Sequence, residues 1–200
     1  ENSNHVEVLD LDADGDRDFV VANGRVGFPE DSFVYRNDGG ARFTRVDIGV
    51  NATANKVDSG DSNADGRPDL LFAASNGVGA VLLENQGGLV FRDRQLALTE
   101  FNSAFEAQLV DLVGDDRDDV FVHAIGCDVF LDQDNNPDCD NDLSGPDVLL
   151  EQTNAGFTDR STLVPHRDDW VHDHKVVATD LDLDGDNDLV AVVNNDPYFT

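Results

Sequence analysis

A nine-residue acidic pattern occurs four times in this sequence and constrains its fold more than any other feature. The copies occupy residues 10–18, 61–69, 111–119 and 180–188, and we call them loops 1 to 4. In loop 4, five aspartates alternate with other residues, and Gly185 holds the sixth position. The loops begin 51, 50 and 69 residues apart, so the sequence predicts a repeat protein.

The alternating carboxylates predict a metal site in these loops. Two like charges about 4 Å apart repel by about 1 to 4 kcal/mol, so a cation is needed to hold them together. A hard divalent ion that takes roughly six to eight oxygen ligands suits the pattern, and a glycine at the sixth position permits the left-handed backbone of a tight turn. We therefore expect calcium. Loop 3 is degraded, because Val113 replaces an oxygen ligand and Asp116 replaces the glycine.

A second signal follows each of loops 1 to 3 and stays in phase with them. It is an Asn-x-Gly turn with a phenylalanine close behind it. The phenylalanine lies 18, 20 and 23 residues before the next loop, so the extra length of the third repeat falls between its loop and its turn. The residues are Asn37, Gly39 and Phe43, then Asn85, Gly87 and Phe91, then Asn154, Gly156 and Phe157.

The acidic loop, the apolar strand after it, the Asn-x-Gly turn and the phenylalanine together resemble the FG-GAP/VCBS repeat family. These are calcium-loop β-propeller repeats that also occur in integrin alpha subunits, and the resemblance covers essentially the whole chain. It implies an all-β propeller of four-stranded blades, with Ca²⁺ in the loop between the first and second strands of each blade. It also implies side-chain ligands at loop positions one, three, five and nine and a backbone carbonyl ligand at position seven.

Carried onto this sequence, the implied ligands form complete sets in loops 1, 2 and 4 and a partial set in loop 3. The carbonyl ligands are those of Asp16, Arg67, Arg117 and Asp186, and the others are side chains. The residues are Asp10, Asp12, Asp14, Asp16 and Asp18; Asp61, Asn63, Asp65, Arg67 and Asp69; Asp111, Asp115, Arg117 and Asp119; and Asp180, Asp182, Asp184, Asp186 and Asp188.

The repeats divide a single domain, residues 1–200, into four units. We call them units 1 to 4, and we expect unit 4 to contain two strands of its blade, which gives about three and a half blades in all. Unpaired edges would remain at both ends, and we expect the rest of a longer protein or neighbouring copies to cover them. The units span about 1–50, 51–100, 101–165 with an insertion at 125–147, and 166–200.

The strands themselves are predicted from apolar runs. Residues 19–22, 70–74 and 189–193 are uninterrupted apolar segments, which is typical of strands covered on both faces. Residues 101–112 are ambiguous, because their apolar positions also fit helical spacing. We favour a strand there, since Asp111 must follow an inner strand for loop 3 to close like the other loops.

The insertion of unit 3 carries two further candidate features. Cys127 and Cys139 lie 12 residues apart, so they form either a disulfide that staples a polar loop or two reduced, buried thiols. Between and around them, oxygen-bearing side chains alternate again, with Pro137 at the position of the glycine. A fifth calcium site and a solvated acidic loop are the alternatives. The residues are Asp132, Asp134, Asn136, Asp138 and Asp140.

The net charge of −29, from 42 acidic and 13 basic residues, makes nucleic acid and anionic membranes poor partners. A halophilic acidic surface would explain the charge but not its regular phasing. We expect a secreted or cell-surface protein, because calcium is abundant outside cells. No apolar run reaches the roughly 18 residues of a membrane span, so none is expected.

One cluster of ionisable residues outside the loops raises the alternative of catalysis. Its histidines could hold a transition metal or act as acid and base in hydrolysis, and Trp170 could stack on a sugar. No nucleophile motif accompanies them, so we expect a solvated connection. The residues are His166, Asp168, Asp169, His172, Asp173 and His174.

We therefore expect a non-catalytic, extracellular calcium-binding module that serves in binding, adhesion or assembly. Its partner would be a protein or carbohydrate ligand, or copies of itself through open blade edges. The alternatives are a self-assembling fibre subunit closed by strand pairing with neighbouring copies, and a propeller-based carbohydrate-active or hydrolytic enzyme.

Overall fold

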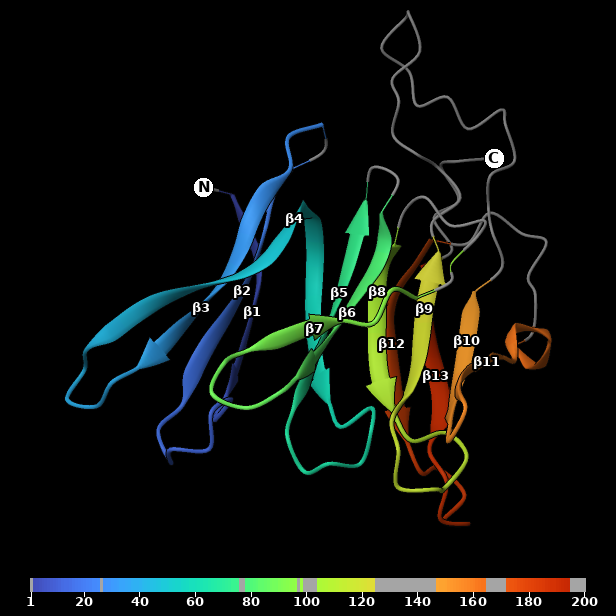
Figure 1. The fold of residues 1–200 in the computed structure, drawn as a ribbon. Helices are drawn as coiled ribbons and strands as arrows, with labels where there is room; N and C mark the ends of the chain where they lie inside the picture. Colours follow the sequence, from blue (N-terminus) through green and yellow to red (C-terminus); the bar gives the residue numbers. More distant parts are fainter. Residues whose placement is uncertain are drawn as a thin grey trace, which may run out of the picture.

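The computed structural model describes residues 2–25, 27–75, 78–96, 98, 104–124, 147–164 and 172–194. Within these residues the chain forms thirteen β-strands, one short 3-10 turn and no α-helix (Figure 1). The strands are β1 Ser3–Leu9, β2 Asp18–Asn23, β3 Glu30–Asn37, β4 Phe43–Gly60, β5 Asp69–Ser75, β6 Gly79–Asn85, β7 Phe91–Asp93, β8 Ala104–Val110, β9 Asp119–Ala124, β10 Val148–Thr153, β11 Gly156–Asp159, β12 His172–Thr179 and β13 Asp188–Asn194, with the 3-10 turn η1 at Ser161–Leu163.

The prediction of an all-β fold is confirmed. The ambiguous segment before loop 3 forms the strand β8, as expected. The register of β8 against β9 matches the register of β1 against β2. The strands pair antiparallel in three sheets, in the orders β1 to β7, β11-β10-β9-β8, and β12-β13. Among the described residues, no helix is long and apolar enough to cross a membrane.

The strand β4 is longer than the sequence indicates. It runs through 18 residues, pairs with β3 through its first half and continues into a pairing with β5. It is therefore the last strand of unit 1 and the first strand of unit 2. When β4 is divided at this point, units 1, 2 and 3 each contain four strands, and the described part of unit 4 contains two.

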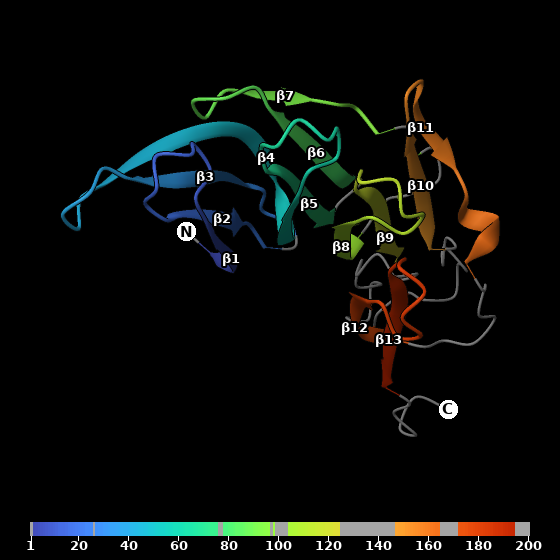
Figure 2. The same cartoon turned by 90° about the horizontal axis from the view of Figure 1, so that it is seen from below.

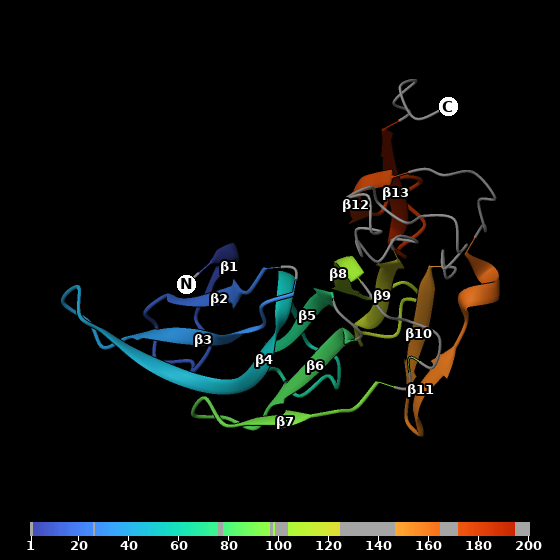
Figure 3. The same ribbon diagram turned by 90° about the horizontal axis from the view of Figure 1, so that it is seen from above.

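The units follow one another along an open arc, and the described strands do not close into a ring (Figures 2 and 3). The first strands β1, β4, β8 and β12 lie on the concave side, where each contacts the next. The same polar contact recurs there: Asn4 Nδ2 donates to the Ala54 carbonyl and Asn55 Nδ2 donates to the Ala104 carbonyl, both at 2.8 Å.

The core lies between the units. One apolar cluster joins unit 1 to unit 2, and a second joins unit 2 to unit 3. All seven residues of β5 are buried, because Leu70 and Phe72 belong to the first cluster while Leu71 and Ala73 belong to the second. The uninterrupted apolar run of this strand thus reflects cover on both faces, as expected.

Candidate metal centre

All four acidic loops occupy the same place in their units. Each joins the first strand to the second: β1 to β2, β4 to β5, β8 to β9, and β12 to β13. They lie together along one side of the molecule, at the lower edge of Figure 1. This is the position that the sequence analysis expected for the loops.

The aspartate at position one organises each loop by accepting backbone hydrogen bonds. In loop 1, Asp10 accepts from the N–H groups of Asp14 at 3.1 Å and Gly15 at 3.0 Å. Asp61 and Asp111 accept the equivalent pairs in loops 2 and 3, and in loop 4 Asp180 accepts from Gly185 at 3.2 Å. The loops are therefore folded by their own carboxylates, and loop 3 is folded like the others.

The backbone turns left-handed at two positions of each loop. Position six has a positive φ in all four, namely 94° at Gly15, 80° at Gly66, 107° at Gly185 and 64° at Asp116. The sequence analysis predicted this for the glycines, and an aspartate tolerates the same conformation in loop 3. Position four is also left-handed, at Ala13, Ala64, Leu183 and Gly114. Sequence reasoning missed it, because only Gly114 signals it.

The aspartate at position nine connects the second strand of its unit to the loop and to the third strand. Asp18, Asp69 and Asp119 are fully buried. In loop 2, Asp69 Oδ2 accepts from the Ser62 N–H at 3.1 Å, and Oδ1 accepts from the Asn85 N–H at the end of β6 at 2.8 Å. Asp18 and Asp119 accept equivalent pairs. Burial raises the pKa of Asp69 and of Asp119 above the usual carboxyl value.

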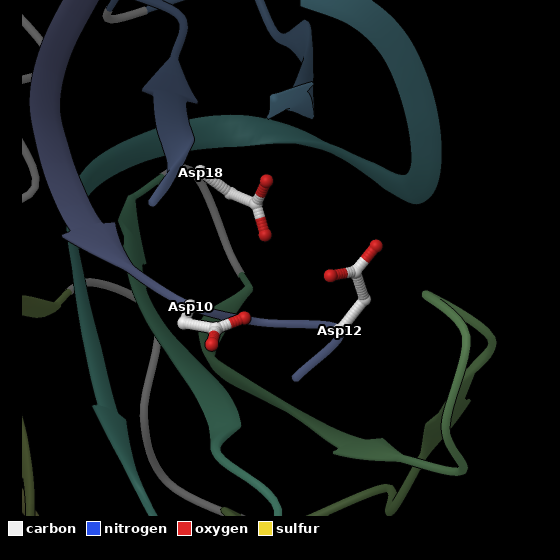
Figure 4. A group of neighbouring side chains, drawn as sticks. All are labelled: Asp10, Asp12 and Asp18. Carbon is white, nitrogen blue, oxygen red and sulfur yellow. The ribbon is translucent and has the colours of Figure 1, made fainter. Parts of the chain in front are cut away.

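In loops 1 and 4 the carboxylates converge. Oxygens of Asp10, Asp12 and Asp18 lie within 4.8 Å of one another and point into a common space (Figure 4). Asp180, Asp182 and Asp188 form the same group in loop 4. The pKa of Asp12 is raised by its partial burial and by the neighbouring charges of Asp18 and Asp14.

Loop 4 shows the repulsion between these charges most directly. The pKa of Asp182 is raised, chiefly by the charge of Asp184 and then by burial and by Asp188. Asp180 Oδ1 is buried and has no hydrogen-bond partner within the described part of the chain. A buried carboxylate oxygen without a partner is costly, so this atom marks a position where a cation would be stabilising.

Loops 2 and 3 replace part of the negative charge with an arginine at position seven. The Arg67 guanidinium forms an ion pair with Asp65, and Arg117 Nη2 lies 2.8 Å from Asp115 Oδ2. The arginine lowers the pKa of Asp115 through this hydrogen bond. The sequence analysis considered only the carbonyl groups of these arginines and missed their side chains, although an arginine two residues after an aspartate is the signal for such a pair.

The residues present fit calcium in loops 1, 2 and 4. Their donors are carboxylate oxygens, an amide oxygen at Asn63 and carbonyl oxygens, which a hard cation prefers. Loop 3 offers no oxygen side chain at Val113, so its donor set is smaller. Which of these residues bind an ion stays a prediction.

Several predicted features lie outside the described residues. These are the Cys127–Cys139 disulfide and the extra site at Asp132, Asp134, Asn136, Asp138 and Asp140. The same holds for His166, Asp168, Asp169 and Trp170, and for the side chains of His172, Asp173 and His174 in β12.

Comparison with protein families gives an independent assignment. A family model described as an FG-GAP-like repeat matches residues 10–72 and again residues 61–122, which together are more than half of the chain. The two matches begin at loop 1 and at loop 2, so the family repeat and the structural repeat are in register. No curated protein matches the sequence. The chain belongs to the FG-GAP-like repeat family.

Proposed function

We propose that this protein is a calcium-binding β-propeller-type repeat module that acts outside the cell in binding or assembly, without catalysis. The observation that carries this proposal is the pair of three-carboxylate groups in loops 1 and 4. In loop 4 the group includes the buried oxygen of Asp180 that lacks a hydrogen-bond partner in the described structure.

The donor chemistry supports calcium as the ion. In the described loops the converging side chains present only oxygen atoms, and transition metals favour nitrogen or sulfur ligands. Calcium tolerates irregular sets of oxygen ligands at flexible geometry, whereas magnesium demands a near-ideal octahedron and keeps several waters. The shape of these loops is set by their own backbone hydrogen bonds, so the loops suit calcium, which has the less strict geometry of the two ions.

The roles of the carboxylates support a structural use of the ion. Asp10 and Asp18 already hold backbone N–H groups, so they are fixed in place rather than presented to a substrate. An ion at this point would join the first strand, the loop and the second strand of a unit. The strong net negative charge and the abundance of calcium outside cells support an extracellular location. A protein or carbohydrate ligand suits the acidic, repeat-built surface.

A calorimetric titration with calcium tests the proposal. We expect chelator-treated protein to bind calcium at two or more sites per chain. The variants Asp12→Asn and Asp182→Asn should each lose one site or weaken it by about tenfold or more, because each removes a charge from a converging group. Asp47→Asn is the matched control, since the Asp47 side chain is 81% exposed and lies on β4, away from the loops. Absence of calcium binding, or unchanged binding in both loop variants, would show the proposal to be wrong.

A further inference from the structure

Loop 3 is folded like the other loops although it offers the fewest metal donors. Val113 removes one oxygen side chain, and Arg117 forms an ion pair with Asp115. The loop keeps its shape because Asp111 accepts the backbone N–H groups of Asp115 and Asp116 at 3.2 and 2.9 Å. These hydrogen bonds give loop 3 a defined shape with an incomplete set of donors.

Asp118, at position eight of loop 3, contacts loop 2 of the preceding unit. Its Oδ2 accepts from the Asp61 N–H at 2.5 Å, and its own N–H donates to the Asp61 carbonyl at 3.2 Å. Asp61 is the aspartate that organises loop 2, because its carboxylate accepts from the N–H groups of Asp65 at 3.0 Å and Gly66 at 2.7 Å. A residue of unit 3 therefore fixes the backbone of the first predicted ligand in unit 2.

The chain makes room for this contact at Gly60, directly before loop 2. A Cβ at Gly60 would clash with Asp118 Oδ2 and with the Leu109 side chain. The backbone at Gly60 is not left-handed, so space and not conformation requires the glycine. On the other side, Asp119 is fully buried and accepts from the Gln152 N–H at 2.9 Å, which anchors the end of loop 3. Asp118 is thus held firmly against loop 2.

Contacts of this kind recur between the other neighbouring loops. In loop 4, position eight is Asn187, and its Nδ2 donates to the Asp111 carbonyl of loop 3 at 2.9 Å. In loop 2, position eight is Pro68, which has no N–H and no polar side chain. There Asn85 Nδ2 donates both to the Pro68 carbonyl at 3.1 Å and to the Leu11 carbonyl of loop 1 at 2.9 Å. The four loops are therefore joined in series through their backbones.

We propose that Asp118 is a positioning residue for the calcium site of loop 2, so that loop 3 contributes to ion binding in the preceding unit. The inference deepens the proposed function and depends on it. Loop 2 has three carboxylates at its predicted side-chain ligand positions, whereas loops 1 and 4 have four, and Arg67 opposes them. A fixed Asp61 matters most in such a loop, because partners that orient a metal ligand typically change affinity by about ten- to a hundredfold.

Calorimetric titration of the full chain with calcium tests this role. We expect Asp118→Ala to weaken one site by about tenfold or more, because the Asp61 N–H loses its acceptor, and to leave the other sites unchanged. Asp118→Asn should recover most of this loss, since Asn187 binds the equivalent aspartate from the same loop position. Asp116→Asn is the matched control. It removes an exposed charge from the same loop, and asparagine tolerates the positive φ at that position.

A second substitution assigns the affected site to loop 2. Asn63→Ala removes the oxygen donor at position three of loop 2, so it should weaken the same site. Adding Asp118→Ala to Asn63→Ala should then cause a smaller further loss than Asp118→Ala causes alone, because both changes act on one site.

Hydrogen exchange in EDTA gives a readout that needs no ion. The Asp61 amide should exchange faster by about tenfold or more in Asp118→Ala than in the wild type, because it loses its hydrogen bond. The Leu109 N–H donates to Asp58 Oδ2 between the same two units at 2.9 Å. Its protection should stay unchanged, which would show that units 2 and 3 remain packed.

Several results would overturn the positioning role alone. These are a loop 2 site that Asp118→Ala leaves unchanged, an equal loss in Asp118→Asn and Asp118→Ala, and a titration that Asn63→Ala does not alter. Faster exchange at both the Asp61 and the Leu109 amides would also overturn it, because Asp118 would then only hold the units together. Failure of every loop to bind calcium would count against the proposed function instead.

Discussion

The aspartate at loop position nine has a structural role that is separate from any metal. Asp69 accepts two backbone N–H groups and the Ser62 hydroxyl while fully buried. An Asp69→Asn side chain has the same shape but carries an N–H₂ group in place of one oxygen, which would face a backbone donor. We expect the free energy of unfolding to fall by about 1 to 3 kcal/mol, because a buried donor loses its acceptor. Urea unfolding measures this change.

The experiment is done in EDTA, so that loss of a calcium ligand does not contribute. Asp47→Asn serves again as the control, because its exposed carboxylate should change stability by no more than about 0.5 kcal/mol. If Asp69→Asn unfolds like the wild type without calcium, the aspartate acts only as a metal ligand.

Single residues in the loops were predictable where the chemistry forces the choice. The glycines at position six predicted the left-handed backbone there, and the alternating carboxylates predicted the converging oxygens of loops 1 and 4. Position four was not predictable from Ala13, Ala64 or Leu183, since alanine and leucine do not ordinarily adopt a positive φ. At position four the hydrogen bonds of the loop determine the backbone conformation, and the residue type does not indicate that conformation.

The strand β4 contains a glycine in a left-handed conformation at the point where its pairing with β3 is interrupted. Gly49 has a φ of 80° and lies in β4 where two extra residues interrupt the register with β3. Its neighbours Ile48 and Val50 are both buried in the first core cluster. Gly49→Ala should lower the free energy of unfolding by about 1 to 2 kcal/mol, because alanine resists this backbone conformation. Urea unfolding in the presence of calcium measures the loss.

The space around Gly49 makes the interpretation direct. An added Cβ would meet no atom within 4 Å, so the cost would come from backbone strain and not from a clash. Asp47→Ala, on the same strand and exposed, should remain within about 0.5 kcal/mol of the wild type. Equal stability of Gly49→Ala and the wild type would mean that the strand bends without this residue.

The sequence predicted most strands but not the continuity of β4. Apolar runs such as residues 70–74 are visible because both faces are buried. The first strand of unit 2 is hidden, because Asn55 and Lys56 interrupt its apolar pattern. These polar residues contact the next unit, with Asn55 bonded to the Ala104 carbonyl and Lys56 paired with Glu106. Such contacts exist only once the units are stacked, so a single repeat read alone does not indicate them.

At the scale of the whole molecule, the four loops concentrate negative charge along one side (Figure 1). The apolar clusters join units 1 to 3, while like charges repel one another within loops 1 and 4, where they help to raise the pKa of Asp12 and of Asp182. Calcium would reverse the sign of this effect, because each ion would bridge carboxylates that otherwise repel. The stability of the fold should therefore depend on calcium more than on any single core residue.

Chelation measures this dependence. A ligand present at ten times its dissociation constant stabilises the folded state by about 1.4 kcal/mol per site, so three or four sites would supply about 4 to 6 kcal/mol. That is comparable with the net stability of a typical domain.

For a chain of this length, each kcal/mol shifts the melting temperature by roughly 2 to 4 °C, so excess EDTA should lower the melting temperature by about 10 to 20 °C. The double variant Asp12→Asn and Asp182→Asn should show a smaller difference between calcium and EDTA. A melting curve that EDTA leaves unchanged would mean that the apolar contacts between units suffice and that the acidic loops have no part in stability.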